Sequence, residues 1–248
     1  MLPGFVNSAS AADPCDRKCL EGYIDKVLAA MIAHNPGQLM FAKDVRYTEN
    51  GVELIPGDGM WGTLSSRGKY NLYVCDTKAG QAGFYGTVSE NGRINYIALR
   101  VKVDEALISE IELIVTRPED TDSPSTPEAG RRMEQRSVRP QFLQTVPPIE
   151  RMSREKLVEI ANSYFTGLAN QTGKFTAPFA ETCELWENGF HTTNQKPNPD
   201  IPAGGIDILC MSCEKQQKSD RNNENQLINL QFFTLNGSIY FVLDHRKT

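Results

Sequence analysis

The residues in this sequence that are best suited to acid–base chemistry include an arginine and a glutamate within apolar runs. Arg100 interrupts the run at residues 97–101, which has the pattern of a central β-strand. A charge there either enters a cavity or reaches solvent, and Lys102 at the same alternation supports the solvent alternative. Inside a cavity, Arg100 would bind a carboxylate or enolate oxygen and stabilise developing negative charge. Glu112 is a candidate partner or base, and its alternative is a surface carboxylate on an edge strand.

Tyr47 and Glu49 form a second candidate pair. They alternate onto one face of a predicted strand, opposite Arg46 and Thr48, so only one of the two pairs faces inward. An inward Tyr47 and Glu49 would supply a proton donor and a proton acceptor. In the alternative interpretation the segment is simply a turn, in which Asn50 and Gly51 adopt the required backbone angles.

Histidine and aromatic side chains provide the remaining candidates. His191 follows a second Glu-Asn-Gly turn and lies near Glu187, which favours it as a catalytic group. His34 ends the first predicted helix, where an imidazole interacts with the negative helix terminus. Trp61 lies in a glycine-rich segment that could fold over the mouth of a pocket. Three tyrosines are further candidates for the pocket wall, against the alternative that all these aromatic residues are core: Tyr23, Tyr73 and Tyr85.

Several chemistries lack any sequence support. No segment matches a nucleophile elbow, a phosphate loop or a dinucleotide fingerprint, so we expect no cofactor. We also expect no metal, because a zinc site needs a second pair of ligands beside Cys210 and Cys213, and Cys75 and Cys183 are isolated. A disulfide from Cys183 to Cys213 or Cys210 is preferred over metal, and Cys75 is expected to be a buried thiol.

Two predicted helices carry the same apolar template. Asp13 and Pro14 predict the start of the first helix, which ends before residues 35–37, and Ser153 predicts the N-cap of the second. The five apolar positions of the second helix follow those of the first at one constant spacing: Leu20, Ile24, Val27, Leu28 and Met31, then Leu157, Ala161, Tyr164, Phe165 and Leu168. The Glu-Asn-Gly segment at residues 49–51 recurs at residues 187–189 with one residue more between the copies. This repetition predicts a duplicated domain.

The chain accordingly divides into a domain at residues 13–117, a linker at 118–148 and a more divergent domain at 149–248. Strands are predicted in the first domain at residues 45–48, 70–75, 83–88, 94–103 and 108–116. The second domain has predicted strands at 183–186, 227–235 and 238–244, the last two joined in a hairpin, and a strand at 141–146 could complete it.

A helix followed by hairpins that close a curved antiparallel sheet resembles the nuclear transport factor 2-like (SnoaL-like) superfamily. More closely, the chain resembles a little-characterised fungal and bacterial family with two such domains. The resemblance lies in CDRKCLEGY at 15–23, RYTENGVEL at 46–54, GDGMWGT at 57–63, ALRVKV at 98–103 and ISEIE at 108–112. It implies an α+β fold of two tandem cone-like barrels, each with a pocket between the helix and the concave sheet face. The superfamily includes dehydratases, cyclases, isomerases, lyases and proteins without catalytic activity.

The expected function is therefore a cofactor-independent lyase, dehydratase, cyclase or isomerase that acts on a small apolar, possibly aromatic, organic molecule. The alternative is a noncatalytic protein that binds a small hydrophobic ligand or forms a dimer. The formal net charge of −5 and the lack of a basic run predict neither nucleic acid nor membrane as a partner, and the duplication is compatible with a monomer or a homodimer. Small residues at positions 9–11 resemble a signal-peptide cleavage site, with a merely flexible N-terminus as the alternative. The six cysteines fit secretion, so a secreted or extracytoplasmic location is expected over a cytoplasmic one.

Overall fold

The structure, a computed structural model, describes residues 15–117, 128–170, 186–187, 190–191, 196, 227–235 and 238–246. Its elements up to residue 117 are one helix, six strands and two 3₁₀ turns: α1 (Arg17–Ile32), η1 (Pro36–Gln38), β1 (Phe41–Glu49), β2 (Val52–Leu54), η2 (Gly59–Gly62), β3 (Leu64–Asp76), β4 (Gln81–Glu90), β5 (Arg93–Asp104) and β6 (Leu107–Thr116). The elements described after residue 127 are α2 (Ala129–Glu134), α3 (Pro140–Leu143), η3 (Pro148–Glu150), α4 (Arg154–Asn170), β7 (Trp186–Glu187), β8 (Phe190–His191), β9 (Leu227–Leu235) and β10 (Ser238–Arg246).

Helix α1 begins at Arg17, so the predicted start at Asp13 and Pro14 is wrong. Asp16 is the N-cap, and its carboxylate accepts a hydrogen bond from the backbone N–H of Cys19 at 2.8 Å. The predicted apolar stripe is confirmed, because all five of its residues are buried on the side of the helix that packs against the sheet. The helix ends at Ile32 with Ala33 as its C-cap, and the next residue, His34, takes the left-handed conformation with φ 51°.

The six strands form one mixed sheet in the order β2-β1-β6-β5-β4-β3. Neighbouring strands are antiparallel, except that β1 runs parallel to β6. All five strands predicted before residue 117 are confirmed, although most are longer than predicted, and β2 was not predicted. The turns at Asn50–Gly51 and Asn91–Gly92 are also confirmed, since all four residues have positive φ. The chain is an α+β protein, as the sequence predicted.

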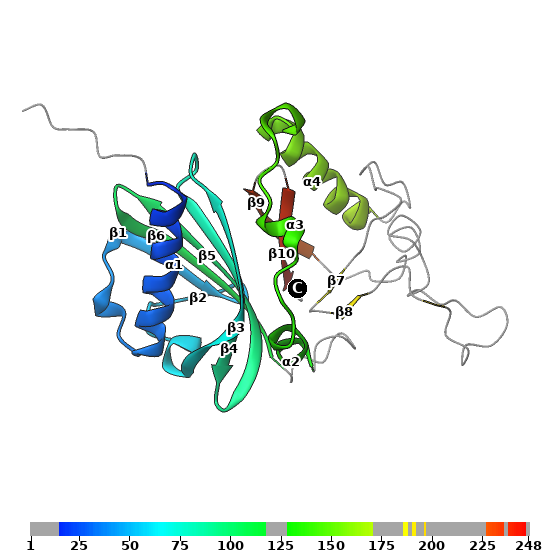
Figure 1. Ribbon diagram of the computed structural model, residues 1–248. Coiled ribbons are helices and arrows are strands. Elements are labelled where there is room, and N and C mark those ends of the chain that lie inside the picture. Colours follow the sequence, from blue (N-terminus) through cyan, green and yellow to red (C-terminus); the bar gives the residue numbers. More distant parts are fainter. Residues whose placement is uncertain are drawn as a thin grey trace, which may run out of the picture.

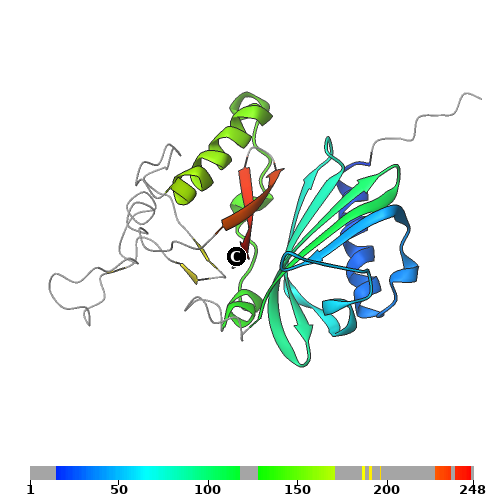
Figure 2. The same cartoon turned by 180° about the vertical axis from the view of Figure 1, so that it is seen from behind.

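Both faces of this sheet are covered. Figure 1 shows α1 against one face, called here the inner face, while α2, α3, α4, β9 and β10 lie on the opposite, outer face; Figure 2 shows the same arrangement from behind. The main hydrophobic core lies between α1 and the inner face, where Leu20 and Ile24 pack with Phe84, Leu99 and Leu113. A second cluster on the outer face joins Tyr70, Leu72, Val74 and Met133 to partly buried Tyr85, Tyr96, Ala98, Ile114, Val138 and Phe142.

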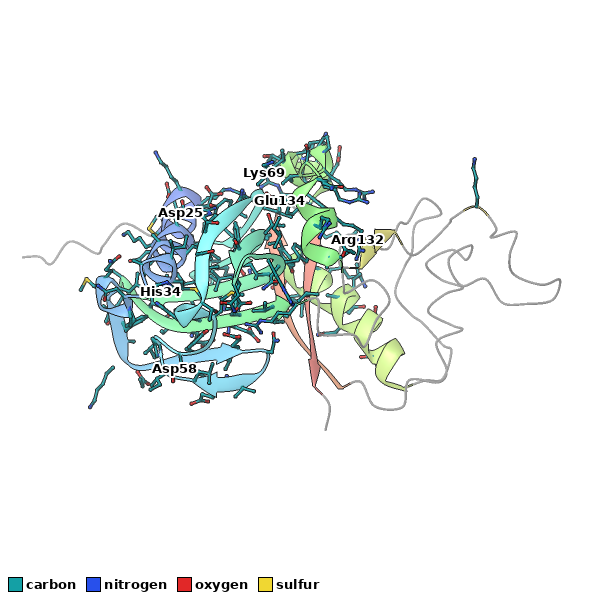
Figure 3. All side chains as sticks on the ribbon, turned by 90° about the horizontal axis from the view of Figure 1, so that it is seen from below. Asp25, His34, Asp58, Lys69, Arg132 and Glu134 are labelled. Carbon is teal, nitrogen blue, oxygen red and sulfur yellow. A yellow bond between two sulfur atoms is a disulfide. The ribbon has the colours of Figure 1, made fainter. Side chains whose placement is uncertain are left out.

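Helix α2 is fixed to the outer face by Glu134. Its carboxylate accepts hydrogen bonds from the backbone N–H of Lys69, at 2.9 Å and 3.1 Å, and from the hydroxyl of Thr87 (Figure 3). Residues 140–143 form α3, so the strand predicted at 141–146 is wrong. Ser153 caps α4 as predicted, because its hydroxyl accepts a hydrogen bond from the N–H of Lys156 at 3.2 Å. The predicted hairpin of β9 and β10 is confirmed by their antiparallel register.

A disulfide joins Cys15 and Cys19 at the start of α1, and it was not predicted. The predicted bridge from Cys183 to Cys210 or Cys213 lies outside the described residues. Cys75 is a buried free thiol, as predicted, and burial raises its pKa to about 12, so it is not a reactive thiolate. None of the described helices is long and apolar enough to cross a membrane.

Gly130 of α2 sets how closely the helix approaches the sheet. A Cβ atom there would stand 1.9 Å from the carbonyl oxygen of Ile94, which is backbone and cannot move aside. We expect Gly130→Ala to lower the free energy of unfolding by roughly 2 kcal/mol, measured by urea denaturation. Gly22→Ala in α1 is the matched control, because a Cβ there meets nothing within 4 Å. It should instead raise stability by about 0.5–1 kcal/mol. Equal stabilisation by both substitutions would show that α2 does not dock here.

Candidate functional site

A group of buried and partly buried polar side chains lies on the inner face, at the end of the sheet where β1, β4 and β6 end and β5 begins. It contains two carboxylates, one guanidinium and three neutral polar groups, and is called here the carboxylate–arginine cluster: Tyr47, Glu49, Thr63, Glu90, Asn95 and Arg117. Five of these side chains come from three strands and the short connection after η2, and Arg117 follows β6 directly. Residues distant in the sequence therefore meet at one end of α1.

Glu49 is held by three donors. Its Oε2 accepts hydrogen bonds from the Tyr47 hydroxyl at 3.1 Å and from the backbone N–H of Met60 at 2.7 Å, and its Oε1 accepts from Nη2 of Arg117 at 2.8 Å. The approach of Met60 depends on Gly59, which has φ +65° and whose missing Cβ would lie 2.3 Å from Oε2 of Glu49. The sequence thus places a glycine where η2 must pass close to the carboxylate.

Glu90 is the second carboxylate, and Arg117 bridges it to Glu49. Arg117 donates to it through Nε at 2.8 Å and Nη2 at 2.9 Å, and Thr63 and Asn95 each donate at 2.6 Å. Burial alone would raise the pKa of Glu90, but the hydrogen bonds and charge of Arg117, with the bonds from Thr63 and Asn95, hold that pKa below its usual range. Glu90 is therefore a carboxylate that accepts hydrogen bonds and donates none.

Asn95 has an acceptor that the cluster does not use. Its side chain is buried, with 2% of the residue exposed, and Nδ2 donates to Oε2 of Glu90. Because an ionised carboxylate can only accept, the amide nitrogen must be the atom that faces Glu90. The opposite atom, Oδ1, is buried and has no hydrogen-bond partner in the structure. Among the residues the structure describes, it is the buried acceptor of this cluster that no hydrogen bond reaches.

The end of strand β6 is positioned by Asn50. This residue has φ 46°, and its side-chain amide bonds both backbone groups of Val115: Nδ2 donates to the carbonyl oxygen at 3.2 Å, and the N–H of Val115 donates to Oδ1 at 2.8 Å. The side chain thereby extends the pairing of β1 with β6 beyond Glu49. Arg117 follows two residues later and reaches back to both carboxylates.

Trp61 closes the cluster on the side of α1. It is fully buried, its indole Nε1 donates to the carbonyl oxygen of Ala30 at 3.2 Å, and its ring meets the edge of Tyr47 at a centroid distance of 5.7 Å. His34, at the end of α1, binds the Trp61 carbonyl through Nδ1 at 2.6 Å, so Nδ1 carries a proton. Figure 3 shows His34 in this region, with Asp58 on the segment that leads into η2.

The protonation states of the cluster follow from these contacts. Burial, followed by the nearby charge and hydrogen bond of Glu49, raises the pKa of Tyr47 far above its usual value, so Tyr47 remains a donor. The hydrogen bond to Glu90 raises the pKa of Arg117 despite burial, so Arg117 remains a cation. The cluster can therefore donate a hydrogen bond, accept hydrogen bonds and stabilise negative charge within an apolar surrounding.

Comparisons with known proteins show similarity over parts of the chain. The second half matches a domain family. The family model described as "Domain of unknown function (DUF8021)" matches residues 150–237. A comparison with curated proteins gives no match. Among solved structures, AclR of Streptomyces galilaeus, provisionally named a hydroxylase, is similar with a TM-score of 0.32 and 11% sequence identity, over 54% of this chain and 92% of that chain.

Arg100 lies on the outer face, so its predicted position in a cavity beside α1 is wrong. It shares that face with Ala98 and Lys102, while Leu99 and Val101 point into the main core. It is nevertheless buried, with 4% exposed, and is paired with Oε2 of Glu112 at 3.0 Å and with Oε2 of Glu110 at 2.7 Å. The predicted pairing with Glu112 is confirmed, but neither residue belongs to the carboxylate–arginine cluster.

The predicted aromatic candidates do not form one wall. Trp61 packs beside the cluster, whereas Tyr85 lies on the outer face. Tyr73 lies on the inner side of edge strand β3, where its hydroxyl donates to Asp25 at 2.6 Å and accepts from Arg67 at 2.5 Å. Tyr23 donates to the carbonyl oxygen of Ala106 at 2.9 Å, which ties α1 to the turn after β5. These contacts are structural in character.

His191 lies in β8, whose backbone pairs it with Trp186 rather than with Glu187; the His191 side chain is outside what the structure describes. Among the described residues no group of three or more His, Cys, Asp or Glu side chains could hold a metal ion. Sequence reasoning found Tyr47 and Glu49 and missed Glu90, Asn95 and Arg117. A signal for Glu90 was present, because residues 90–92 repeat the Glu-Asn-Gly of residues 49–51.

Proposed function

We propose that this chain is a tandem nuclear transport factor 2-like protein whose first domain binds a small, largely apolar organic molecule beside the carboxylate–arginine cluster. The order of α1 followed by a sheet that it covers supports the first barrel. The order of α4 followed by the β7–β8 and β9–β10 pairs supports a second copy of the same plan. The boundaries proposed for the two domains remain residues 13–117 and 149–248.

The proposed chemistry is acid–base catalysis of the lyase, dehydratase, cyclase or isomerase type, without a cofactor. The observation that carries it is the direct contact between a buried hydroxyl donor, Tyr47, and a buried carboxylate, Glu49, with Arg117 beside them. Tyr47 would donate a proton or hydrogen bond to the substrate, and Glu49 would accept one. Arg117, rather than Arg100, would stabilise negative charge as it develops, because Arg117 contacts Glu49 whereas Arg100 lies on the outer face.

Noncatalytic binding is the second candidate, and one observation favours it. Tyr47 has one hydroxyl proton and already donates it to Glu49, so it can donate to a substrate only if it leaves Glu49. A binding protein needs no such exchange. The two candidates therefore differ in whether the cluster moves a proton.

Proton abstraction can be tested without knowing the full reaction. The chain is incubated in D₂O with a panel of small aromatic ketones, and loss of the signals from the C–H groups next to the carbonyl is followed by NMR. We expect exchange above the buffer rate, reduced by about 100-fold or more in Tyr47→Phe and Glu49→Gln. Arg46→Ala is the control, because Arg46 lies on the same strand but points outward and is exposed. Ketones that bind without accelerated exchange would support the binding protein and exclude the acid–base proposal.

The Cys15–Cys19 disulfide supports an extracytoplasmic location, because disulfides persist in oxidising compartments. We propose secretion, with a small organic molecule as the partner and with neither nucleic acid nor membrane involved. Measuring free thiols on the chain purified from its native source tests the location, since a reduced Cys15 and Cys19 pair would contradict it.

A further inference from the structure

We propose that the molecule bound at the carboxylate–arginine cluster carries a protonated amine, which donates a hydrogen bond to Oδ1 of Asn95. This inference rests on the proposed function, and it specifies the chemical class of the ligand. It differs from the expectation of an anionic head group, which came from placing Arg100 in the pocket.

The first support is the number of acceptors left open. Each carboxylate oxygen has two lone pairs. Both oxygens of Glu90 already accept two hydrogen bonds each, and Oε2 of Glu49 also accepts two. Among the carboxylate and amide oxygens of the cluster, the open capacity consists of Oδ1 of Asn95 and one lone pair on Oε1 of Glu49. A ligand group that only donates, such as an ammonium, matches this pattern better than a group that must also accept.

The second support is the charge of the cluster. Within the described residues, Arg117 is the cation that pairs with both Glu49 and Glu90, so these three side chains together carry a net charge of one negative unit. Asp58 adds a negative charge close enough to raise the pKa of Tyr47 as one of several causes. A carboxylate ligand would be repelled in this partly desolvated site, whereas an ammonium would balance the charge.

The third support is the apolar surrounding of Asn95. The neighbouring inner-face side chains on β4 and β5 are Val88 and Ile97, and both belong to the main core. A buried polar group that lacks a partner is costly in such a place, so a ligand donor that satisfies Oδ1 contributes more than the same hydrogen bond would at the surface. The body of the ligand should accordingly be aromatic or aliphatic, and only its head should be charged.

Three probes that share a phenyl group test the charge class: 2-phenylethylamine, 2-phenylethanol and phenylacetate. Each is titrated against the full chain at neutral pH, with dissociation constants measured by ligand-observed NMR. We expect the amine to bind at least about tenfold more tightly than the alcohol, and phenylacetate to bind most weakly. This ranking uses the unmodified protein, so it does not depend on whether any variant folds. Tighter binding of the alcohol or of phenylacetate would overturn the inference and leave the proposed binding function intact. If none of the three probes binds, both the inference and the proposed binding function are overturned.

A pair of variants tests the role of Asn95 itself. Asn95→Leu removes the open acceptor and one hydrogen bond to Glu90, whereas Thr63→Val removes one hydrogen bond to Glu90 and leaves Oδ1 of Asn95 in place. We expect Asn95→Leu to weaken binding of the amine about tenfold or more and Thr63→Val to weaken it clearly less, by roughly threefold. Equal losses in both variants would mean that affinity depends on the hydrogen bonds that position Glu90. Asn95 would then make no direct hydrogen bond to the ligand, and the inference would be overturned. An unchanged affinity in Asn95→Leu would also overturn the inference, with Oδ1 then satisfied by a structural water only.

Discussion

Replacing Trp61 by alanine is expected to lower the free energy of unfolding by about 4 kcal/mol, because it removes a large, fully buried side chain from the junction of α1, η2 and the sheet. The substitution also deletes the hydrogen bond from the indole to the carbonyl oxygen of Ala30 and the edge contact with Tyr47. Urea denaturation followed by circular dichroism measures the loss, since the fluorescence of the protein changes with the tryptophan itself.

Trp61→Phe is the matched control. It keeps most of the buried ring and removes only the indole N–H and part of the volume, so the expected loss is about 1.5 kcal/mol. The sequence also allowed Trp61 to be a cover over a pocket mouth, and that role predicts a different result. If Trp61→Ala weakens ligand binding and leaves the urea midpoint unchanged, Trp61 acts as a mobile cover over the pocket. The structural role that we assign to its packing against α1 would then be wrong.

The strands and turns before residue 117 were predictable because each has a local cause. Residues 94–103 and 108–116 either alternate between polar and apolar side chains or are continuously apolar over the length of a strand. Asn91 and Gly92 adopt the two positive φ angles that a tight hairpin needs. The start of α1 was less well determined, because both Asp13 and Asp16 are good N-caps. In the structure Asp16 makes the capping bond, and Cys15 lies just outside the helix, in reach of Cys19 for the disulfide.

The candidate site was only half predictable, for a reason visible at Arg100. Alternation along a strand separates two faces but does not say which face meets the helix. The sequence argument took one face as core and the other as solvent, so a charge in the middle of a strand had either to enter a cavity or to reach solvent. In the structure both faces are covered, and Arg100 is buried with Glu110 and Glu112 on the outer one. Arg117 could not be assigned either, because its partners Glu49 and Glu90 are distant in the sequence.

Removing Arg117 tests whether the cluster depends on this one cation. In Arg117→Ala the buried carboxylates of Glu49 and Glu90 lose their shared partner, and an uncompensated buried charge is strongly destabilising. We expect a loss of about 3 kcal/mol, because the arginine side chain is itself 28% exposed and water can replace part of its contacts. For a chain of 248 residues this corresponds to a Tm lower by roughly 6–12 °C, measured by thermal denaturation.

Two variants separate charge from geometry at this position. Arg117→Lys keeps the cation but cannot reproduce the fork of N–H groups that spans both carboxylates, so an intermediate loss is expected. Arg46→Ala, on the same strand as Glu49, removes an ion pair with Glu53 of β2. Both side chains of that pair are more than half exposed, so stability should change by less than about 0.5 kcal/mol. If Arg117→Ala is no more harmful than Arg46→Ala, Glu49 and Glu90 are solvated in solution. The negative charge that selects an amine would then be screened by water, so the stability of this variant bears directly on the ligand class as well as on the fold.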